Sequence, residues 1–217
     1  MPAEPKLPEA LAPLAVPEDG LTDETGWYRQ ELRDADLSGQ VADLVEIEQC
    51  RLAGVDLSGT VLNRAEITDC AIERSSLANL RAEESALRRV RLTGARLTGL
   101  QWLGGTLRDV TVSGCRTDLA VFRGSGFRDV LFTGCDLTRA DFQDADLGGA
   151  RFVDCDLTAA QFSRATMTGT RFSGCLLVGV GGVASFDGAV LTSQDLPALT
   201  EAMAAALGIR VEDPELG

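Results

Sequence analysis

A large hydrophobic residue recurs at every fifth position over most of the chain. Steps of five from Leu32 to Leu177 give thirty positions, and twenty-seven of them hold Leu, Ile, Val, Phe, Met or Trp. This period matches neither the roughly 3.6 residues of a helical turn nor the two-residue alternation of a long strand. The chain must therefore turn once in each repeat, which predicts a stack of short repeating segments.

The residue two places before each hydrophobic position is small or short. From Cys50 onward it is Ala, Cys, Ser, Thr, Val or Gly, except at Leu80 and Leu100, and all six cysteines occupy this position. In an extended segment, residues two apart point to the same side. We therefore expect both positions to face inward. The other three, mostly polar or Gly, should face water and form a turn that favours positive φ.

Several segments resemble the repeat of the pentapeptide-repeat family, which is a small residue, Asp or Asn, Leu or Phe, and two variable positions. They are ADLSG at 35–39, VDLSG at 55–59, CDLTR at 135–139, ADFQD at 140–144 and ADLGG at 145–149. The resemblance covers about residues 32–177, without an insertion. It implies an all-β fold, a right-handed quadrilateral β-helix with four repeats, and hence twenty residues, per coil.

Thirty repeats would form seven and a half such coils. Residues twenty apart then stack about 4.8 Å from one another in successive coils. The expected cysteine columns are Cys115, Cys135, Cys155 and Cys175 on one face, and Cys50 and Cys70 on the adjacent face. The expected core columns are Phe132, Phe152 and Phe172; Phe122, Phe142 and Phe162; and Leu137, Leu157 and Leu177.

The chain divides into three predicted regions. Residues 1–26 are an acidic, proline-rich N-terminal tail that we expect to be disordered, 27–191 form the β-helix, and 192–217 hold a short C-terminal α-helical cap and a tail. Pro197 suits the first turn of this helix and Gly208 its end. The stretch VGVGGVASFDGAV shifts the repeat phase, so we expect an irregular last coil.

The apolar side of the C-terminal helix predicts a contact, either with the last coil or with a second copy of the chain. In related proteins a C-terminal helix pairs two rods end to end, so a homodimer is expected. The candidate dimer interface is Leu196, Leu199, Met203 and Leu207.

The cysteine columns do not suit a metal or redox site. A ladder with a spacing of about 4.8 Å cannot place four sulfurs at about 2.3 Å from one zinc ion. In-register parallel side chains also hold their Cβ atoms farther apart than a disulfide prefers. We expect reduced, buried core thiols and no cofactor or metal. The chain contains no histidine, which removes the commonest general base, and no enzyme activity is expected.

The net charge of −13 is distributed in bands. Residues 34–73 hold nine acids and two bases, residues 81–128 hold nine bases and four acids, and residues 129–156 hold seven acids and two bases. One face carries Arg88, Arg108 and Arg128 in consecutive coils, but no aromatic residues interleave them, so direct nucleic-acid binding is not expected.

Several members of the family resemble B-form DNA and occupy the DNA groove of DNA gyrase, a type II topoisomerase. The resemblance thus implies a DNA mimic that modulates or protects gyrase, as in antibiotic resistance. The best candidates for this contact are Asp136, Asp141, Asp144, Asp146, Asp154 and Asp156. A uniform mimic would not be interrupted by a basic band, because a phosphate backbone is uniformly negative. The alternative is a rigid interaction solenoid with an unrelated protein partner.

The N-terminal sequence predicts the compartment. It lacks the basic n-region and the uninterrupted apolar h-region of a signal peptide. No apolar run is long enough to span a membrane. We therefore expect a cytoplasmic protein without a membrane partner.

Overall fold

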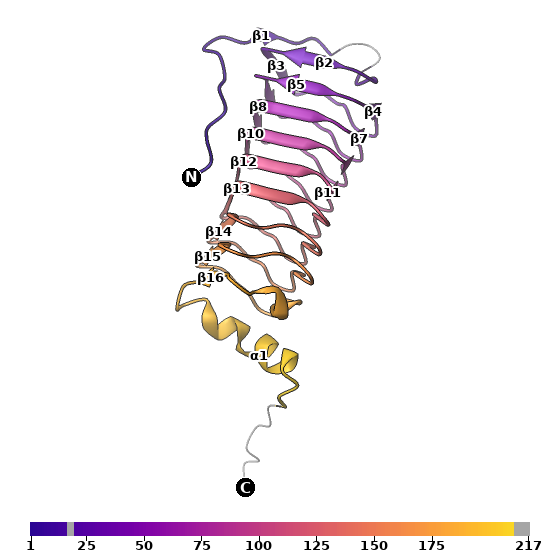
Figure 1. Cartoon of the computed structure of the whole chain (residues 1–217). Helices are drawn as coiled ribbons and strands as arrows, with labels where there is room; N and C mark the ends of the chain where they lie inside the picture. Colours follow the sequence, from indigo (N-terminus) through magenta and orange to yellow (C-terminus); the bar gives the residue numbers. More distant parts are fainter. Residues whose placement is uncertain (17–19, 211–217) are drawn as a thin grey trace.

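The computed structural model describes residues 1–16 and 20–210, and these form a β-solenoid of about nine turns with one short C-terminal helix (Figure 1). The all-β fold class is therefore confirmed. The solenoid is longer than the predicted seven and a half coils because it extends beyond the strictly periodic region at both ends. Leu21 and Trp27 are already buried in the core, and the chain pairs once more at Val190–Leu191.

The strands fall into a 12-stranded and a 4-stranded parallel sheet. The elements are β1 (Ala12–Pro13), β2 (Gly26–Tyr28), β3 (Gln30–Arg33), β4 (Val41–Asp43), β5 (Glu46–Glu48), β6 (Arg51–Ala53), β7 (Val61–Asn63), β8 (Glu66–Glu73), β9 (Arg81–Glu83), β10 (Ala86–Thr93), β11 (Gln101–Leu103), β12 (Thr106–Ser113), β13 (Gly126–Thr133), β14 (Arg151–Val153), β15 (Arg171–Ser173), the 3-10 helix η1 (Val183–Ser185), β16 (Val190–Leu191) and α1 (Leu196–Ala206).

The register between coils is twenty residues, as in the pairs Leu87 with Leu107 and Phe132 with Phe152. We name the four sides of the coil faces A to D in chain order. Face A contains β2, β5 and the first halves of β8, β10, β12 and β13. Face B contains β3, β6, β14, β15 and the second halves of those four strands. Face C is held by single bridges such as Asp36 with Asp56, and face D contains β4, β7, β9 and β11.

The turn between faces has a fixed backbone signature. Every fifth residue from Glu24 to Gly179 has a positive φ, and many of these residues are not glycine. Left-handed backbone is unfavourable for a residue with a Cβ, especially a branched or bulky one. Leu44 and Leu119 adopt it nevertheless, with φ of 57° and 58°. The stacking of coils thus imposes the turn on whatever residue the sequence supplies.

The bore is filled by stacked hydrophobic columns, as predicted. Phe132 and Phe152 stack at 5.2 Å between ring centroids with an angle of 6°, and Phe142 and Phe162 stack at 5.2 Å with an angle of 3°. Leu137, Leu157 and Leu177 are fully buried. Toward the N-terminal end Leu, Ile and Val replace Phe in these columns and leave a purely apolar cavity of about 40 Å³ in the bore.

The small inward residues also connect the coils through hydrogen bonds. The backbone N–H of Val55 donates to Ser75 Oγ at 3.1 Å, and that of Ala95 donates to Cys115 Sγ at 3.3 Å. In the other direction, Thr60 Oγ1 donates to the carbonyl of Leu37 at 2.7 Å. A buried N–H without a partner is costly. Ser, Thr and Cys at the small position therefore pair groups that Ala would leave unpaired.

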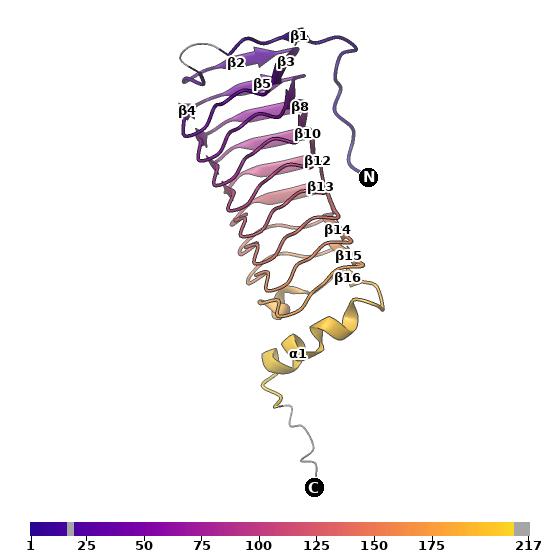
Figure 2. The same cartoon turned by 180° about the vertical axis from the view of Figure 1, so that it is seen from behind.

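The N-terminal segment differs from the disordered tail that the sequence predicts. Residues 2–14, which we call the strap, lie outside the coils: the segment runs along the corner between faces A and B and then turns across the N-terminal end of the rod (Figures 1 and 2). The strand β1 within the strap pairs with β3, which covers the open edge of the first coil. Residues 17–19, which belong to the predicted tail, lie outside the described residues. The order arises because polar groups of the strap find partners on the corner, which composition alone does not reveal.

The C-terminal end of the solenoid is irregular, as the phase shift predicts. The register between β15 and β16 is nineteen residues, since Phe172 pairs with Leu191, and η1 replaces one side of the coil. The ring of Phe186 continues the aromatic column, stacked on Phe172 at 5.6 Å. The helix α1 follows, with Pro197 in its first turn and Gly208 past its end at a φ of 69°. The predicted C-terminal tail at 211–217 lies outside the described residues.

Candidate protein-binding surface

The six candidate aspartates do not form one surface. The side chains of Asp136 and Asp156 belong to face C, and Asp154 lies at the corner between faces B and C. Asp141 belongs to face D, Asp144 lies at the corner between faces D and A, and Asp146 belongs to face A. The sequence thus predicts the periodic placement of these acids, and the structure distributes them over three consecutive sides of the rod.

Four of these acids have a structural task. The Oδ1 atom of Asp136 accepts a hydrogen bond from the backbone N–H of Thr138 at 3.0 Å, and Asp156 does the same for Thr158 at 2.9 Å. Asp141 and Asp146 hold the turns that follow them in the same way. Short carboxylates commonly cap a turn two residues on. This explains the recurrent Asp of the repeat without a role in binding.

Two candidates are neutralised by arginines. Arg123 contacts Asp141 Oδ2 through Nη2 at 2.6 Å, and Arg164 binds both oxygens of Asp144 at 2.6 and 2.8 Å. The hydrogen bonds from Arg164 hold the pKa of Asp144 below its ordinary value. These two acids therefore present little net negative charge to a partner.

The corner between faces B and C carries the strongest acidic feature among the candidates. A shallow hollow there is lined by Asp136, Asp154 and Asp156 together with Gly134, Cys135, Cys155, Gly174 and Leu176. Among the described residues, none of the ion pairs involves these three aspartates. Their charge is available to a cationic group of a partner.

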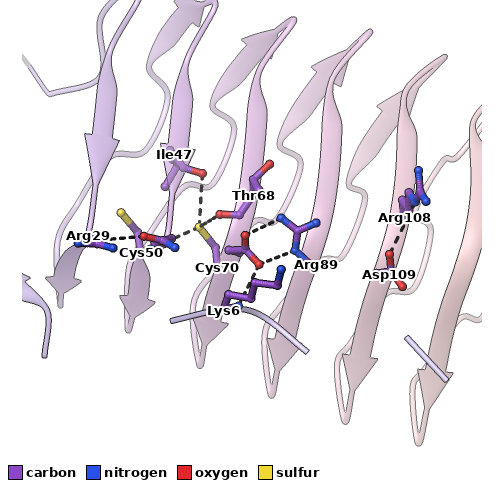
Figure 3. Close-up of polar contacts among 11 residues, drawn as sticks. Lys6, Arg29, Ile47, Cys50, Thr68, Cys70, Arg89, Arg108 and Asp109 are labelled. Carbon is purple, nitrogen blue, oxygen red and sulfur yellow. Dashed lines mark hydrogen bonds and ion pairs between the residues drawn. The ribbon is translucent and has the colours of Figure 1, made fainter. Parts of the chain in front are cut away.

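The arginine ladder on face A is formed as the sequence predicts. Arg88 pairs in register with Arg108, and Arg108 with Arg128, on β10, β12 and β13. The ladder lines a second shallow hollow with Ala86, Leu87, Thr106, Leu107 and Gly126. The nearest acid to Arg108 is Asp109, whose Oδ2 lies 3.7 Å from Arg108 Nε (Figure 3).

The cysteine columns are buried, and all six thiols are free. The Sγ of Cys135 donates to the carbonyl of Val112 at 3.3 Å, and the Sγ of Cys175 donates to that of Phe152 at 3.4 Å. Burial raises the pKa of Cys175, so its thiol stays protonated near neutral pH. Within residues 1–16 and 20–210, no group of three or more His, Cys, Asp or Glu side chains is arranged to hold a metal ion.

The four candidate dimer residues, at helix α1 and its C-terminal end, differ in their exposure. Leu199 is 2% exposed and packs within the chain against the end of the solenoid core, so it is not available to a second copy. Leu196, Met203 and Leu207 are exposed by 52%, 43% and 75%. The sequence pattern places all four on one apolar side but does not show how much of that side the last coil covers.

The strap is an ordered element on this surface that the sequence did not predict. Ala3 and Lys6 donate their backbone N–H groups to Asp109 and Asp69 on the A–B corner. Lys6 lies beside Arg89 (Figure 3), and both residues donate hydrogen bonds to the carboxylate of Asp69. The available signal was the spacing of Pro2, Pro5 and Pro8.

None of the helices in the described part of the chain is long and apolar enough to cross a membrane.

Comparison with known proteins identifies the repeat. The family described as pentapeptide repeats matches residues 31–79 and 135–174, with eight copies. The match is to a repeat module, and it coincides with the segments in which Asp precedes Leu or Phe. No curated protein matches the chain in sequence.

Three solved structures illustrate the likeness. QnrB1, a plasmid-mediated fluoroquinolone resistance protein, has 19% identity and a TM-score of 0.38, with 89% of this chain and 100% of that chain covered. HetL, a pentapeptide repeat protein involved in heterocyst differentiation regulation from the cyanobacterium Nostoc sp. strain PCC 7120, has 21% identity and a TM-score of 0.29, with 79% and 91% covered. A pentapeptide repeat protein from the Arabidopsis thaliana thylakoid lumen has 20% identity and a TM-score of 0.29, with 57% and 69% covered.

The family match and the geometry agree in detail. The matched repeats share the five-residue φ pattern and the twenty-residue register with the segment between them, and most of them have the inward pair of a small and a large residue. Over residues 31–79 and 135–174 the chain consists of the repeats that define the pentapeptide-repeat family.

Proposed function

We propose that this chain is a non-catalytic, rigid scaffold that binds a protein partner through its charged columns. The observation that supports the proposal is that like charges repeat in register on the outside of the rod, as in Asp136 with Asp156 and in the ladder of Arg88, Arg108 and Arg128. Like charges directly opposite one another on paired strands are destabilising. A partner of opposite charge relieves this repulsion and is steered toward the rod.

The more specific candidate partner is DNA gyrase, bound by mimicry of the negative charge of DNA. The acidic hollow of Asp136, Asp154 and Asp156 supports this candidate. Its carboxylates come from two successive coils along one corner, and among the described residues none of them is paired with an arginine. Arg96 and Arg116 precede them on the same face. The mimic is therefore confined to the C-terminal part of the rod. We place this activity in the cytoplasm.

Gyrase supercoiling with the purified protein titrated in, alone and with a fluoroquinolone, tests this candidate. We expect inhibition or drug protection that is lost when Asp136→Asn and Asp156→Asn are combined. The matched control combines Asp141→Asn and Asp144→Asn, which changes the net charge equally but removes acids already paired with arginines. The asparagine oxygen preserves the turn caps at three of these positions. Equal loss in both variants, or no effect of the wild type at micromolar concentration, would rule out the acidic hollow as a gyrase site.

We also propose that the rod forms a homodimer through the exposed part of α1. Leu196, Met203 and Leu207 form an apolar strip that the last coil leaves uncovered. Met203→Glu combined with Leu207→Glu should give a monomer in light scattering, whereas Ala205→Glu, which lies on another side of the helix, should leave the mass unchanged. An unchanged mass in the double variant would place the dimer contact elsewhere or show that there is none.

A further inference from the structure

The strap is held on the A–B corner chiefly through its backbone. The N–H of Ala3 donates to Asp109 Oδ1 at 3.0 Å, and the N–H of Lys6 donates to Asp69 Oδ1 at 2.9 Å. One side-chain contact adds to these, between Glu4 and Arg91 at 3.1 Å. Carboxylates that accept main-chain N–H groups do not depend on the side chains of the segment that they bind. The corner therefore recognises an extended chain, and Arg91 favours an acid at one position of it.

The spacing of the strap matches the spacing of the coils. Asp69 and Asp109 are two coils apart, which is about 9.6 Å at strand spacing. Ala3 and Lys6 are three residues apart, which is about 9.3 Å in a polyproline II helix. Pro2 and Pro5 directly precede the two donating residues, and Pro8 continues the three-residue period. Proline has no N–H of its own and fixes φ in the extended range. The two donating N–H groups of the strap are therefore about as far apart as the two aspartates that accept them.

The carboxylate of Asp69 is the centre of the site. Its side chain is 4% exposed, and Arg89 binds it through Nε and Nη2, both at 2.6 Å. The N–H of Lys6 adds a third donor. A buried carboxylate is stable only when it is paired and hydrogen-bonded. Arg89 orients the carboxylate, and the docked chain completes its set of donors.

We propose that the A–B corner is a binding site for an extended, proline-rich, acidic segment of a partner protein, and that the strap occupies this site in competition. The proposal rests on the scaffold function above and names the kind of segment that the scaffold accepts. The seated strap shows what the site fits: an N–H at one residue and again three residues later, proline before each, and an acid after the first.

The strap sets the affinity that a partner must exceed. A segment tethered by a short linker competes at an effective concentration in the millimolar range. The two backbone hydrogen bonds and the one exposed ion pair that hold residues 3–6 on the corner are individually modest. A partner segment with the same contacts would not displace it, whereas one that adds contacts further along the rod would.

The test uses the full chain and a labelled peptide. Ala3→Pro combined with Lys6→Pro removes both N–H donors and keeps the strap extended, so we expect it to vacate the corner. The matched control combines Ala3→Ser and Lys6→Ala, which retains both donors. The probe is the peptide MPAEPKLPE, the sequence of residues 1–9, with a fluorophore at its C-terminus. In fluorescence anisotropy, the proline variant should bind it at least about tenfold more tightly than the control variant.

Two further comparisons establish the site. Asp69→Ala combined with Asp109→Ala, in the proline variant, removes both acceptors of the peptide N–H groups and should weaken peptide binding at least about tenfold. Asp34→Ala, which removes an aspartate that has a positive φ but lies on the B–C corner, should not. The peptide with Glu4 replaced by lysine should bind more weakly than the original peptide, because it would face Arg91.

The outcomes separate this proposal from the proposed function. Equal binding to the proline and control variants, no binding to either, or binding that survives loss of both aspartates would overturn the peptide site. None of these results depends on the gyrase assay. Hydrogen exchange provides an independent measurement. The amides of Ala3 and Lys6 should be protected in the wild type, and they should lose that protection when Asp69→Ala and Asp109→Ala are introduced without the proline substitutions.

Discussion

The carboxylate of Asp195 accepts a hydrogen bond of 2.8 Å from the backbone N–H of Cys175, twenty positions earlier in the chain. Asp195 is 2% exposed, and its second oxygen accepts the hydroxyl of Thr192 at 2.6 Å. In earlier coils the same kind of N–H donates to a Ser or Cys side chain of the next coil, as Ala95 does to Cys115. Asp195 thus ends the ladder by supplying the acceptor that a further coil would have provided.

Asp195→Ala should destabilise the C-terminal end of the solenoid by about 1–3 kcal/mol, because it leaves the buried N–H of Cys175 without a partner. Hydrogen exchange at the Cys175 amide would detect the change, together with a lower midpoint of thermal unfolding. Asp187→Ala, which removes an exposed acid from the same coil, is the control. Equal effects of the two variants would contradict the assigned role of Asp195.

Gly105→Ala should destabilise the rod by about 1–3 kcal/mol through overpacking. A Cβ at this position would collide with the carbonyl of Ser85 and with the indole of Trp102, which enters the bore beside it. Gly126→Ala, on the outside of face A, would meet no atom within 4 Å and should be nearly neutral. Chemical denaturation of both variants measures the difference. A neutral Gly105→Ala would show that Trp102 can move aside.

Leu119→Gly should stabilise the protein by about 0.5–1 kcal/mol. Leu119 is 49% exposed and has a φ of 58°, a conformation that costs a residue with a Cβ about 1–2 kcal/mol. Glycine relieves this strain but loses about 0.5–1 kcal/mol in conformational entropy. Leu176→Gly is the control, since Leu176 is 56% exposed and has no positive φ. It should be destabilising, and a gain in both variants would indicate a cause other than backbone strain.

The buried pair of Asp69 and Arg89 predicts a specific acid sensitivity. The hydrogen bonds from Arg89, joined by the N–H of Lys6, hold the pKa of Asp69 below its ordinary value. A carboxyl with a lowered folded-state pKa contributes its stability above the unfolded-state pKa and loses it as the pH falls through the folded-state pKa. The free energy of unfolding should therefore fall below about pH 4 more steeply in the wild type than in Asp69→Asn. Parallel curves would contradict the lowered pKa of Asp69 in the folded state.

The sequence predicts the solenoid more fully than it predicts the surface. The columns of Phe132, Phe152 and Phe172 follow from counting in steps of twenty, because each coil stacks directly on the previous one. The acids follow the same rule, yet Asp141 and Asp144 prove to be paired with Arg123 and Arg164, which lie 18 and 20 positions away. Pairing of long side chains across coils depends on their conformation and not on register alone. The sequence could therefore not show which of the six predicted aspartates are unpaired and line the acidic hollow.

The five-residue period by itself determined that the chain folds as a stack of short segments with one turn in each repeat, since no helix or long strand can repeat a hydrophobic and a small residue in that order. The resemblance of the repeats to the pentapeptide motif added the coil of twenty residues. The period also determined that the cysteines are core residues. Only the tertiary structure decided the two ends of the rod. Whether Leu199 faces the last coil or a second chain, and whether the proline-rich segment is disordered or docked, depends on contacts between distant parts of the chain. Asp69 and Lys6 are 63 positions apart, and no local pattern encodes the hydrogen bond between them.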